Sequence, residues 1–278
     1  MKWVLLGLLL LQWPHSLKAE PMVLVDAVAL LPKNTAPVTT EGKALAHILA
    51  LYPSAYSTEN ISRNRARAWV KAAKNACIPW LKKTKARQQD FLFSLPYMLE
   101  EPLQLVLLQN SQALPKLQNL PQPVPLQQLL SAGNLLLGIE QNRSYGEALD
   151  KLLQQHQHNR ALYLRTSSSE DQSSMMPMLQ RRFVDALIEY PRIANRSGLP
   201  LVFFPVAEAE AVNLVYFACS KGEQGQRVVS SLNQIILQLS QQQAYRDLVL
   251  QHLPEAQRQQ GAQIWQAALS EPTKTGSN

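Results

Sequence analysis

The chain alternates short apolar runs with amphipathic segments of helical period. The apolar run at 21–31, the segment 56–61 and the apolar start of the stretch 76–97 predict strands. Between them, residues 40–52 and 62–75 carry apolar side chains at helical spacing. An order of strand, helix, strand, helix, strand is typical of an α/β protein with open, mostly parallel sheets flanked by helices.

The pattern changes after a further apolar strand at 103–108. Residues 110–128 are dominated by Gln, Pro, Asn and Leu, which predicts a linker or a lobe boundary. The alternation then restarts, and a nearly continuous apolar strand at 212–219 leads into three helices. We therefore expect two lobes joined by two crossings. Lobe 1 would comprise residues 20–108 and 206–270, lobe 2 residues 109–205, and a polar tail residues 271–278.

Residues 1–19 have the pattern of a cleaved signal peptide. Lys2 precedes an apolar run that is short for a bilayer span, and Ala19 is a small residue suited to cleavage. A retained N-terminal anchor is the alternative, although Pro14 interrupts the run. Cleavage after Ala19 would release a periplasmic protein that is not inserted in the membrane.

Composition indicates a globular, mildly basic mature chain. The sequence is 46% hydrophobic and 17% charged, with 27 Lys and Arg against 20 Asp and Glu, and loss of Lys2 and Lys18 lowers the net charge from +7 to +5. Basic residues gather at 63–87 with few interleaved aromatic side chains, which favours a solvated helix face over a nucleic-acid surface. Motifs for nucleophilic, zinc-protease or nucleotide chemistry are missing from the sequence, so we expect a protein that is not an enzyme and needs no cofactor or metal.

The sequence has two cysteines, Cys77 and Cys219. In an exported protein an even pair favours one disulfide. It would close a loop of about 140 residues and contribute on the order of 4 kcal/mol in the chain-entropy model. Two buried free thiols are the alternative, because the sequence does not give the separation of the two Cβ atoms.

Four short segments carry a family resemblance. Thr84-x-x-Arg87 is followed by Phe-Ser-x-Pro-Tyr, which ends at Tyr97. The later segments are Gly138-Ile139-Glu140 with Ser144-Tyr145, Arg182-Phe183-Val184-Asp185-Ala186, and Ser220-Lys221 with Asn233. In this order they resemble bacterial family 3 extracellular solute-binding proteins, the polar amino-acid binders of ABC importers, and the chain resembles a divergent branch of them.

The resemblance implies a type II periplasmic binding fold, whose two lobes close on a ligand. It implies a monomeric receptor for a small polar, carboxylate-bearing ligand that is amino-acid-like, with an inner-membrane permease as partner for ABC-type uptake. The alternative is a periplasmic sensor or interaction module that keeps the fold and regulates a partner protein. Neither reading involves nucleic acid.

The resemblance also assigns site residues. Arg87, preceded by Thr84, would clamp the ligand carboxylate, because a planar guanidinium makes a bidentate charge-assisted pair with it. Glu189 and Tyr190 stand where these binders place an aspartate for the α-amino group, so either Glu189 substitutes or zwitterion recognition is lost. The further ligand-binding candidates are Arg143 and Ser144 in the second-lobe loop, and Trp80 and Tyr97 in the first lobe.

Five of these candidates also have a structural alternative. Arg87 would instead pair with Asp90 or an exposed acid, and Ser144 would cap the helix that follows it. Glu189 would be a solvated loop acid, while Trp80 and Tyr97 would belong to the core or the rim.

Overall fold

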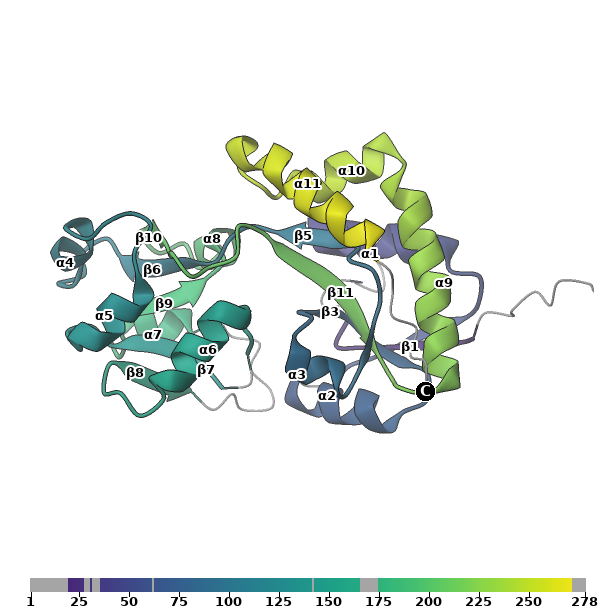
Figure 1. Ribbon diagram of the computed structural model, residues 1–278, viewed down its shortest axis with the longest axis horizontal. Coiled ribbons are helices and arrows are strands. Elements are labelled where there is room, and N and C mark those ends of the chain that lie inside the picture. Colours follow the sequence, from purple (N-terminus) through teal and green to yellow (C-terminus); the bar gives the residue numbers. More distant parts are fainter. Residues whose placement is uncertain are drawn as a thin grey trace, which may run out of the picture.

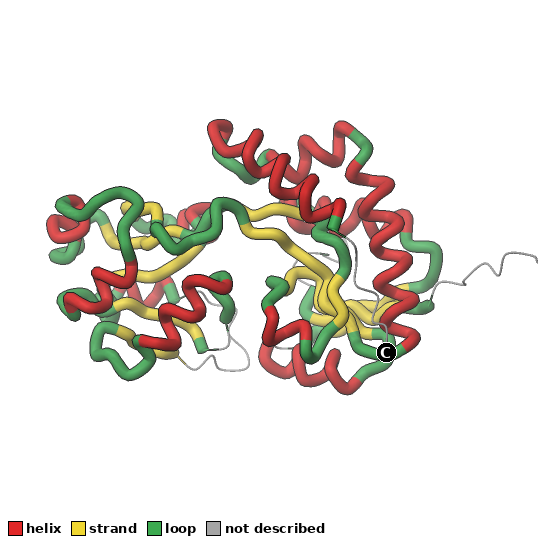
Figure 2. The backbone as a smooth tube through the Cα atoms, in the orientation of Figure 1, coloured by secondary structure: helices red, strands yellow, loops and turns green. Residues whose placement is uncertain are grey.

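The computed structural model describes residues 20–27, 31, 36–61, 63–141, 143–165 and 175–271. The chain forms two lobes, each built on one β-sheet, which lie side by side and are joined by extended segments (Figure 1). Helices cover both sheets (Figure 2). The predicted two-lobed α/β fold is confirmed. The predicted signal peptide and the tail from residue 272 onward lie outside the described residues, within which no helix is long and apolar enough to cross a bilayer.

The sheet of lobe 1 is mixed. Its strand order is β2-β1-β3-β11-β4, and β5 pairs with β11 off this path. The first three strands are parallel, as predicted, but β11 runs antiparallel to β3, β4 and β5 because it enters from lobe 2. The bounds are β1 Met22–Val25, β2 Tyr56–Glu59, β3 Ala76–Leu81, β4 Leu92–Phe93, β5 Met98–Glu100 and β11 Asn213–Cys219.

The sheet of lobe 2 has the order β10-β6-β9-β7-β8. Strand β7 is parallel to β8 and β9, whereas β6 is antiparallel to β9 and β10. This sheet is therefore mixed as well, rather than mostly parallel. The bounds are β6 Gln104–Leu108, β7 Leu137–Glu140, β8 Leu162–Arg165, β9 Ala186–Glu189 and β10 Leu201–Pro205.

Two expectations about the first crossing are wrong. Strand β6 pairs within lobe 2, so the chain leaves lobe 1 at residues 101–103 rather than after residue 108. Residues 110–128 are not a linker, because Leu117, Val124 and Leu126 are buried in the core of lobe 2. Their apolar side chains face this core while most of the intervening Gln side chains face solvent.

Successive residues of the central strands of lobe 1 point to opposite faces, and both faces are covered. Leu24 and Cys77 face a core formed with α1, α9, α10 and α11, whereas Val25 and Ile78 face a smaller core with α2. In lobe 2, α4, α5 and α6 contribute to one core and α7 and α8 to the other. The helix bounds are α1 Thr40–Leu51, α2 Arg63–Ala72, α3 Lys85–Gln88, α4 Leu114–Gln118, α5 Leu126–Ala132, α6 Glu147–Gln155, α7 Met176–Gln180, α8 Pro191–Asn195, α9 Glu223–Ser240, α10 Gln243–Leu250 and α11 Glu255–Ser270.

The two cysteines lie directly opposite each other on β3 and β11. Their sulfur atoms are 2.06 Å apart and both residues are fully buried, so the predicted disulfide is confirmed. It ties the C-terminal strand to the N-terminal half of lobe 1.

The segment Phe-Ser-x-Pro-Tyr is held by side chains that come from distant parts of the chain. The Ser94 hydroxyl accepts a hydrogen bond from the Phe217 amide at 3.0 Å, and Asn233 accepts one from the Leu95 amide at 2.7 Å. The indole of Trp265 donates to the carbonyl of Pro96 at 2.8 Å. These contacts fix the path of the chain just before the first crossing.

Candidate functional site

A cavity of about 340 Å³ lies between the two lobes. The parallel strands of both sheets point their carboxyl ends at it. Asp26 and Lys82 follow β1 and β3 in lobe 1, and Glu140 and Glu189 end β7 and β9 in lobe 2. Ligands of open α/β sheets bind at this end of the strands, so the cavity is the leading candidate for a binding site.

The lining combines charges of both signs with aromatic rings. Five carboxylates and five basic groups reach it, together with Trp80, Tyr97 and Tyr190. Such a surface suits a small polar ligand that carries charge. The charged residues are Asp26, Glu41, Glu100, Glu140 and Glu189, and Arg67, Lys82, Arg87, Arg143 and Arg196.

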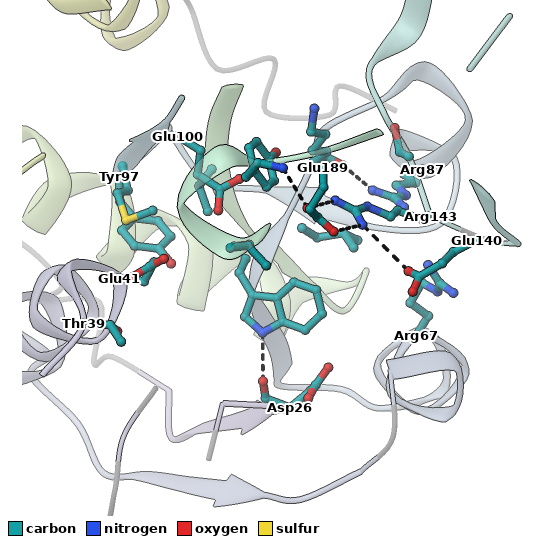
Figure 3. Close-up of a pocket in the computed structure, with 18 of the residues that line it drawn as sticks. Asp26, Thr39, Glu41, Arg67, Arg87, Tyr97, Glu100, Glu140, Arg143 and Glu189 are labelled. Carbon is teal, nitrogen blue, oxygen red and sulfur yellow. Dashed lines mark hydrogen bonds and ion pairs between the residues drawn. The ribbon is translucent and has the colours of Figure 1, made fainter. Parts of the chain in front are cut away.

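Arg87 lies on α3, a single helical turn after β3. Thr84 is the N-cap of this turn, and its hydroxyl accepts a hydrogen bond from the Arg87 amide at 3.3 Å. The Arg87 guanidinium donates to the carbonyl of Lys82 at 3.0 Å and lines the cavity (Figure 3). The alternative partner Asp90 pairs with Lys71 instead, at 2.5 Å. Arg87 is therefore held at the cavity by its own loop.

Thr84 itself lies in a neighbouring pocket, beside Lys83 and Gly146. Its hydroxyl caps the turn that carries Arg87. The observed role of Thr84 is thus to shape the loop, and a direct ligand contact stays a prediction.

Arg143 and Glu189 form a bidentate pair within lobe 2. Arg143 Nη1 donates to Glu189 Oε2 at 2.7 Å and Nη2 donates to Oε1 at 2.5 Å, while the Tyr190 amide donates to Oε1 at 2.9 Å (Figure 3). Burial alone would lower the pKa of Arg143, but the charge and hydrogen bonds of Glu189 raise it well above its ordinary value. Glu189 is thus a buried partner of Arg143 and not a solvated loop acid.

The guanidinium of Arg143 also contacts aromatic rings. Its Cζ lies 5.0 Å from the ring centroid of Tyr145 and 6.0 Å from that of Tyr190. The Tyr145 hydroxyl accepts a hydrogen bond from the Glu140 amide at 2.9 Å. These contacts connect the ends of β7 and β9.

Ser144 lines the cavity but also organises the start of α6. Its hydroxyl donates to Asp150 Oδ2 at 2.5 Å, and the Tyr145 amide donates to the other oxygen of Asp150 at 2.7 Å. The Gly146 amide in turn donates to the Ser144 hydroxyl at 3.3 Å. The expected alternative, a role at the beginning of the helix, therefore describes its observed contacts.

Trp80 and Tyr97 both line the cavity from lobe 1. The Trp80 indole donates to the carbonyl of Asp26 at 2.8 Å. Tyr97 is fully buried and its hydroxyl donates to the carbonyl of Pro79. Their rings form part of the floor of the cavity, while their polar atoms are satisfied inside lobe 1.

Buried polar groups at the crossings were not identified from the sequence. Burial raises the pKa of Glu100, and hydrogen bonding to Tyr190 opposes this shift only in part. Burial also lowers the pKa of Lys82, whose ammonium donates to the side chain of Asn213 on β11. In both groups burial therefore works against the charged form.

A second contact between the lobes lies behind the cavity. The Arg192 guanidinium of α8 pairs with Glu41 of α1, and the Arg192 amide donates to Glu101 Oε1 at 2.6 Å. His252 Nε2 lies 3.9 Å from Glu41 Oε2. Burial acts to raise the pKa of Glu41, but the charge of Arg192, a backbone hydrogen bond and the smaller contributions of His252 and Arg196 together lower it. Because Glu41 also lines the cavity, this junction and the candidate site share a residue.

Within the described residues, no group of three or more His, Cys, Asp and Glu side chains could hold a metal ion.

No protein-family model matches the chain, and no curated protein matches it in sequence. Solved structures do resemble it. A putative L-cystine ABC transporter protein from Listeria monocytogenes matches with a TM-score of 0.63 at 14% identity, covering 86% of this chain and 98% of that one. An amino acid ABC transporter substrate-binding protein from Streptococcus pneumoniae, bound to L-arginine, matches with a TM-score of 0.60 at 13% identity, covering 84% and 93%.

A periplasmic binding protein from Salmonella typhimurium with high arginine specificity matches with a TM-score of 0.58 at 11% identity, covering 83% of this chain and 97% of that one. The chain is therefore similar over most of its length to amino-acid ABC transporter substrate-binding proteins. The similarity confirms the type II periplasmic binding fold.

Proposed function

We propose that this protein is a non-enzymatic, extracytoplasmic receptor for a small polar solute of the amino-acid class. It would bind the solute between its lobes and deliver it to an ABC-type importer, after removal of residues 1–19. The observation that carries the proposal is the cavity of about 340 Å³ at the carboxyl ends of the strands, with Arg87 on its lobe 1 side. The fold similarity to amino-acid binders supports the same conclusion.

Arg87 is the proposed anchor of the ligand carboxylate. Its guanidinium donates to the carbonyl of Lys82 at the cavity, and a planar guanidinium forms a bidentate, charge-assisted pair with a carboxylate. Away from bulk water, a charge-assisted pair with a carboxylate is stronger than at the surface. Closure of the lobes would then bury the pair and select the liganded form.

A thermal-shift screen tests the proposal. The probes are the proteinogenic L-amino acids, L-cystine and small dicarboxylates, each added to the purified mature protein. A ligand that binds only the folded state stabilises it by about 2.7 kcal/mol at a concentration of 100 times its Kd, which gives a measurable rise in Tm. We expect at least one probe to raise the Tm, and Arg87→Ala to abolish that rise.

Arg65→Ala is the matched control, because Arg65 is an exposed arginine on α2 outside the cavity lining. It should keep the ligand response of the wild type. If no probe stabilises the wild type, the proposed function is wrong. If Arg87→Ala responds to the ligand as the wild type does, the proposed anchor is wrong.

A further inference from the structure

The lobe 2 wall of the cavity holds three charged side chains in one small cluster: Arg143, Glu189 and Glu140. Arg143 and Glu189 neutralise each other through two hydrogen bonds, and the second lone pair used on Glu189 Oε1 is taken by the Tyr190 amide. Glu189 is 6% exposed and Arg143 18%. The pair is thus complete and largely removed from water.

Glu140 is the carboxylate of this cluster that takes no part in the bidentate pair of Arg143 and Glu189. Its side chain is 13% exposed, and its ion pair is with Arg143 Nη1 at 4.0 Å, which is too long for a hydrogen bond. The same Nη1 already donates to Glu189 at 2.7 Å. Two carboxylates therefore share one guanidinium, and the cluster carries one surplus negative charge on the side of Glu140.

The backbone around Glu140 is fixed, so the carboxylate is presented at a defined place. Glu140 is the last residue of β7, and its amide donates to the Tyr145 hydroxyl at 2.9 Å. Tyr145 in turn lies under the guanidinium of Arg143. Glu140 and Arg87 line the same cavity from opposite lobes (Figure 3).

We propose that Glu140 binds a cationic nitrogen of the ligand, while Arg87 on the other lobe binds the ligand carboxylate. The ligand is then a zwitterion that bridges the lobes, and its cation balances the surplus charge of the lobe 2 cluster. Glu189 holds Arg143 in place and does not contact the ligand nitrogen. This inference rests on the proposed function, and it names the group that the sequence alone did not identify.

One alternative partner for Glu140 lies on lobe 1. Arg67 of α2 lines the same cavity, so closure of the lobes without a ligand could bring Arg67 to Glu140. The two possibilities differ in what removal of the Glu140 charge does to the unliganded protein. A partner on the protein makes that charge stabilising, whereas a surplus charge awaiting a ligand is neutral or destabilising.

The experiment compares Glu140→Gln with the wild type by isothermal titration of the mature protein. The probes are the L-amino acid that stabilises the wild type most in the screen, and the 2-hydroxy acid with the same side chain, in which a hydroxyl replaces the ammonium. If that amino acid has a basic side chain, an analogue with a neutral side chain is added. We expect Glu140→Gln to bind the amino acid about 10- to 100-fold more weakly, the usual cost of losing one charge-assisted hydrogen bond.

The variant should bind the analogue that lacks the relevant cation as tightly as the wild type does. Glu223→Gln removes the same charge from an 88% exposed side chain on α9 and should leave both affinities unchanged. Without ligand, the Tm of Glu140→Gln should equal or exceed that of the wild type.

Equal affinity of Glu140→Gln and wild type for the amino acid overturns the inference and leaves the proposed function standing. The same holds for an unliganded Glu140→Gln with a clearly lower Tm, which would indicate a protein partner such as Arg67. Binding of no probe by the wild type overturns the proposed function together with the inference.

Discussion

His252 is a buried histidine at the junction between the lobes, and it makes the stability of the protein sensitive to acid. His252 follows α10 in the chain, and its side chain is 5% exposed. The charged groups that face it are Glu41 of α1 and Arg192 and Arg196 of α8. Burial, reinforced by the two arginines, lowers its pKa from 6.5 to about 4.

The sign and the size of the effect follow from this shift. The folded protein holds His252 neutral, while the unfolded chain takes up a proton as the pH falls through 6.5. The destabilising contribution of His252 to the free energy of unfolding is therefore absent above the unfolded pKa. It grows as the pH falls and reaches its limit below about pH 4. As the pH falls from about 7 to about 5, proton uptake by His252 in the unfolded chain lowers the free energy of unfolding by about 2 kcal/mol.

Urea unfolding at about pH 7 and about pH 5 tests this, with the loss of stability compared among variants. In His252→Gln the loss between the two pH values should be smaller than in the wild type by about 2 kcal/mol. His158→Gln, which changes an exposed histidine, should keep the wild-type loss. An NMR titration of the His252 ring should give a pKa of about 4. The reasoning is refuted if His252→Gln loses as much stability as the wild type.

Two further changes test the packing of lobe 1. The double variant Cys77→Ala with Cys219→Ala opens a loop with a sequence separation of 142 residues, and it should lower the free energy of unfolding by on the order of 4 kcal/mol in urea titrations; an unchanged stability would contradict this. Gly225→Ala would place a methyl group 1.8 Å from the carbonyl oxygen of Ser220, so it should lower the free energy of unfolding by about 1–3 kcal/mol. Gln226→Ala, at the exposed neighbouring position on the same helix, should be nearly neutral by the same measurement.

Local periodicity was sufficient for most elements of the fold, because burial of one face leaves a pattern in the sequence. The strand at 212–219 and the helix at 40–52 correspond to β11 and α1. The assignment of β6 to a lobe failed, since it depends on pairing with β9 and β10 far along the chain. The composition break after β6 reflected solvent-facing glutamines on short helices and not a boundary.

The resemblance predicted more of the cavity lining than the residue pattern did. Arg87, Trp80 and Tyr97 from lobe 1, and Arg143, Ser144, Glu189 and Tyr190 from lobe 2, all line the same cavity. Contacts between side chains that are distant in sequence could not be predicted from the residue pattern. Arg143 and Glu189 are 46 positions apart, and Glu41 meets Arg192 only because the lobes are placed together. The pairing of Arg143 with Glu189 is the contact on which the proposed role of Glu140 rests.

The path of the chain through the two sheets has a consequence for biosynthesis. All strands of lobe 2 lie between β5 and β11, so its sheet is complete once β10 has left the ribosome. Lobe 1 must wait for β11, which pairs with β3, β4 and β5. Until then one edge of β3 is unpaired, and Cys77 has no thiol partner. Lobe 1 is thus the first lobe to be started and the last to be completed, and its disulfide forms only after β11 has been made.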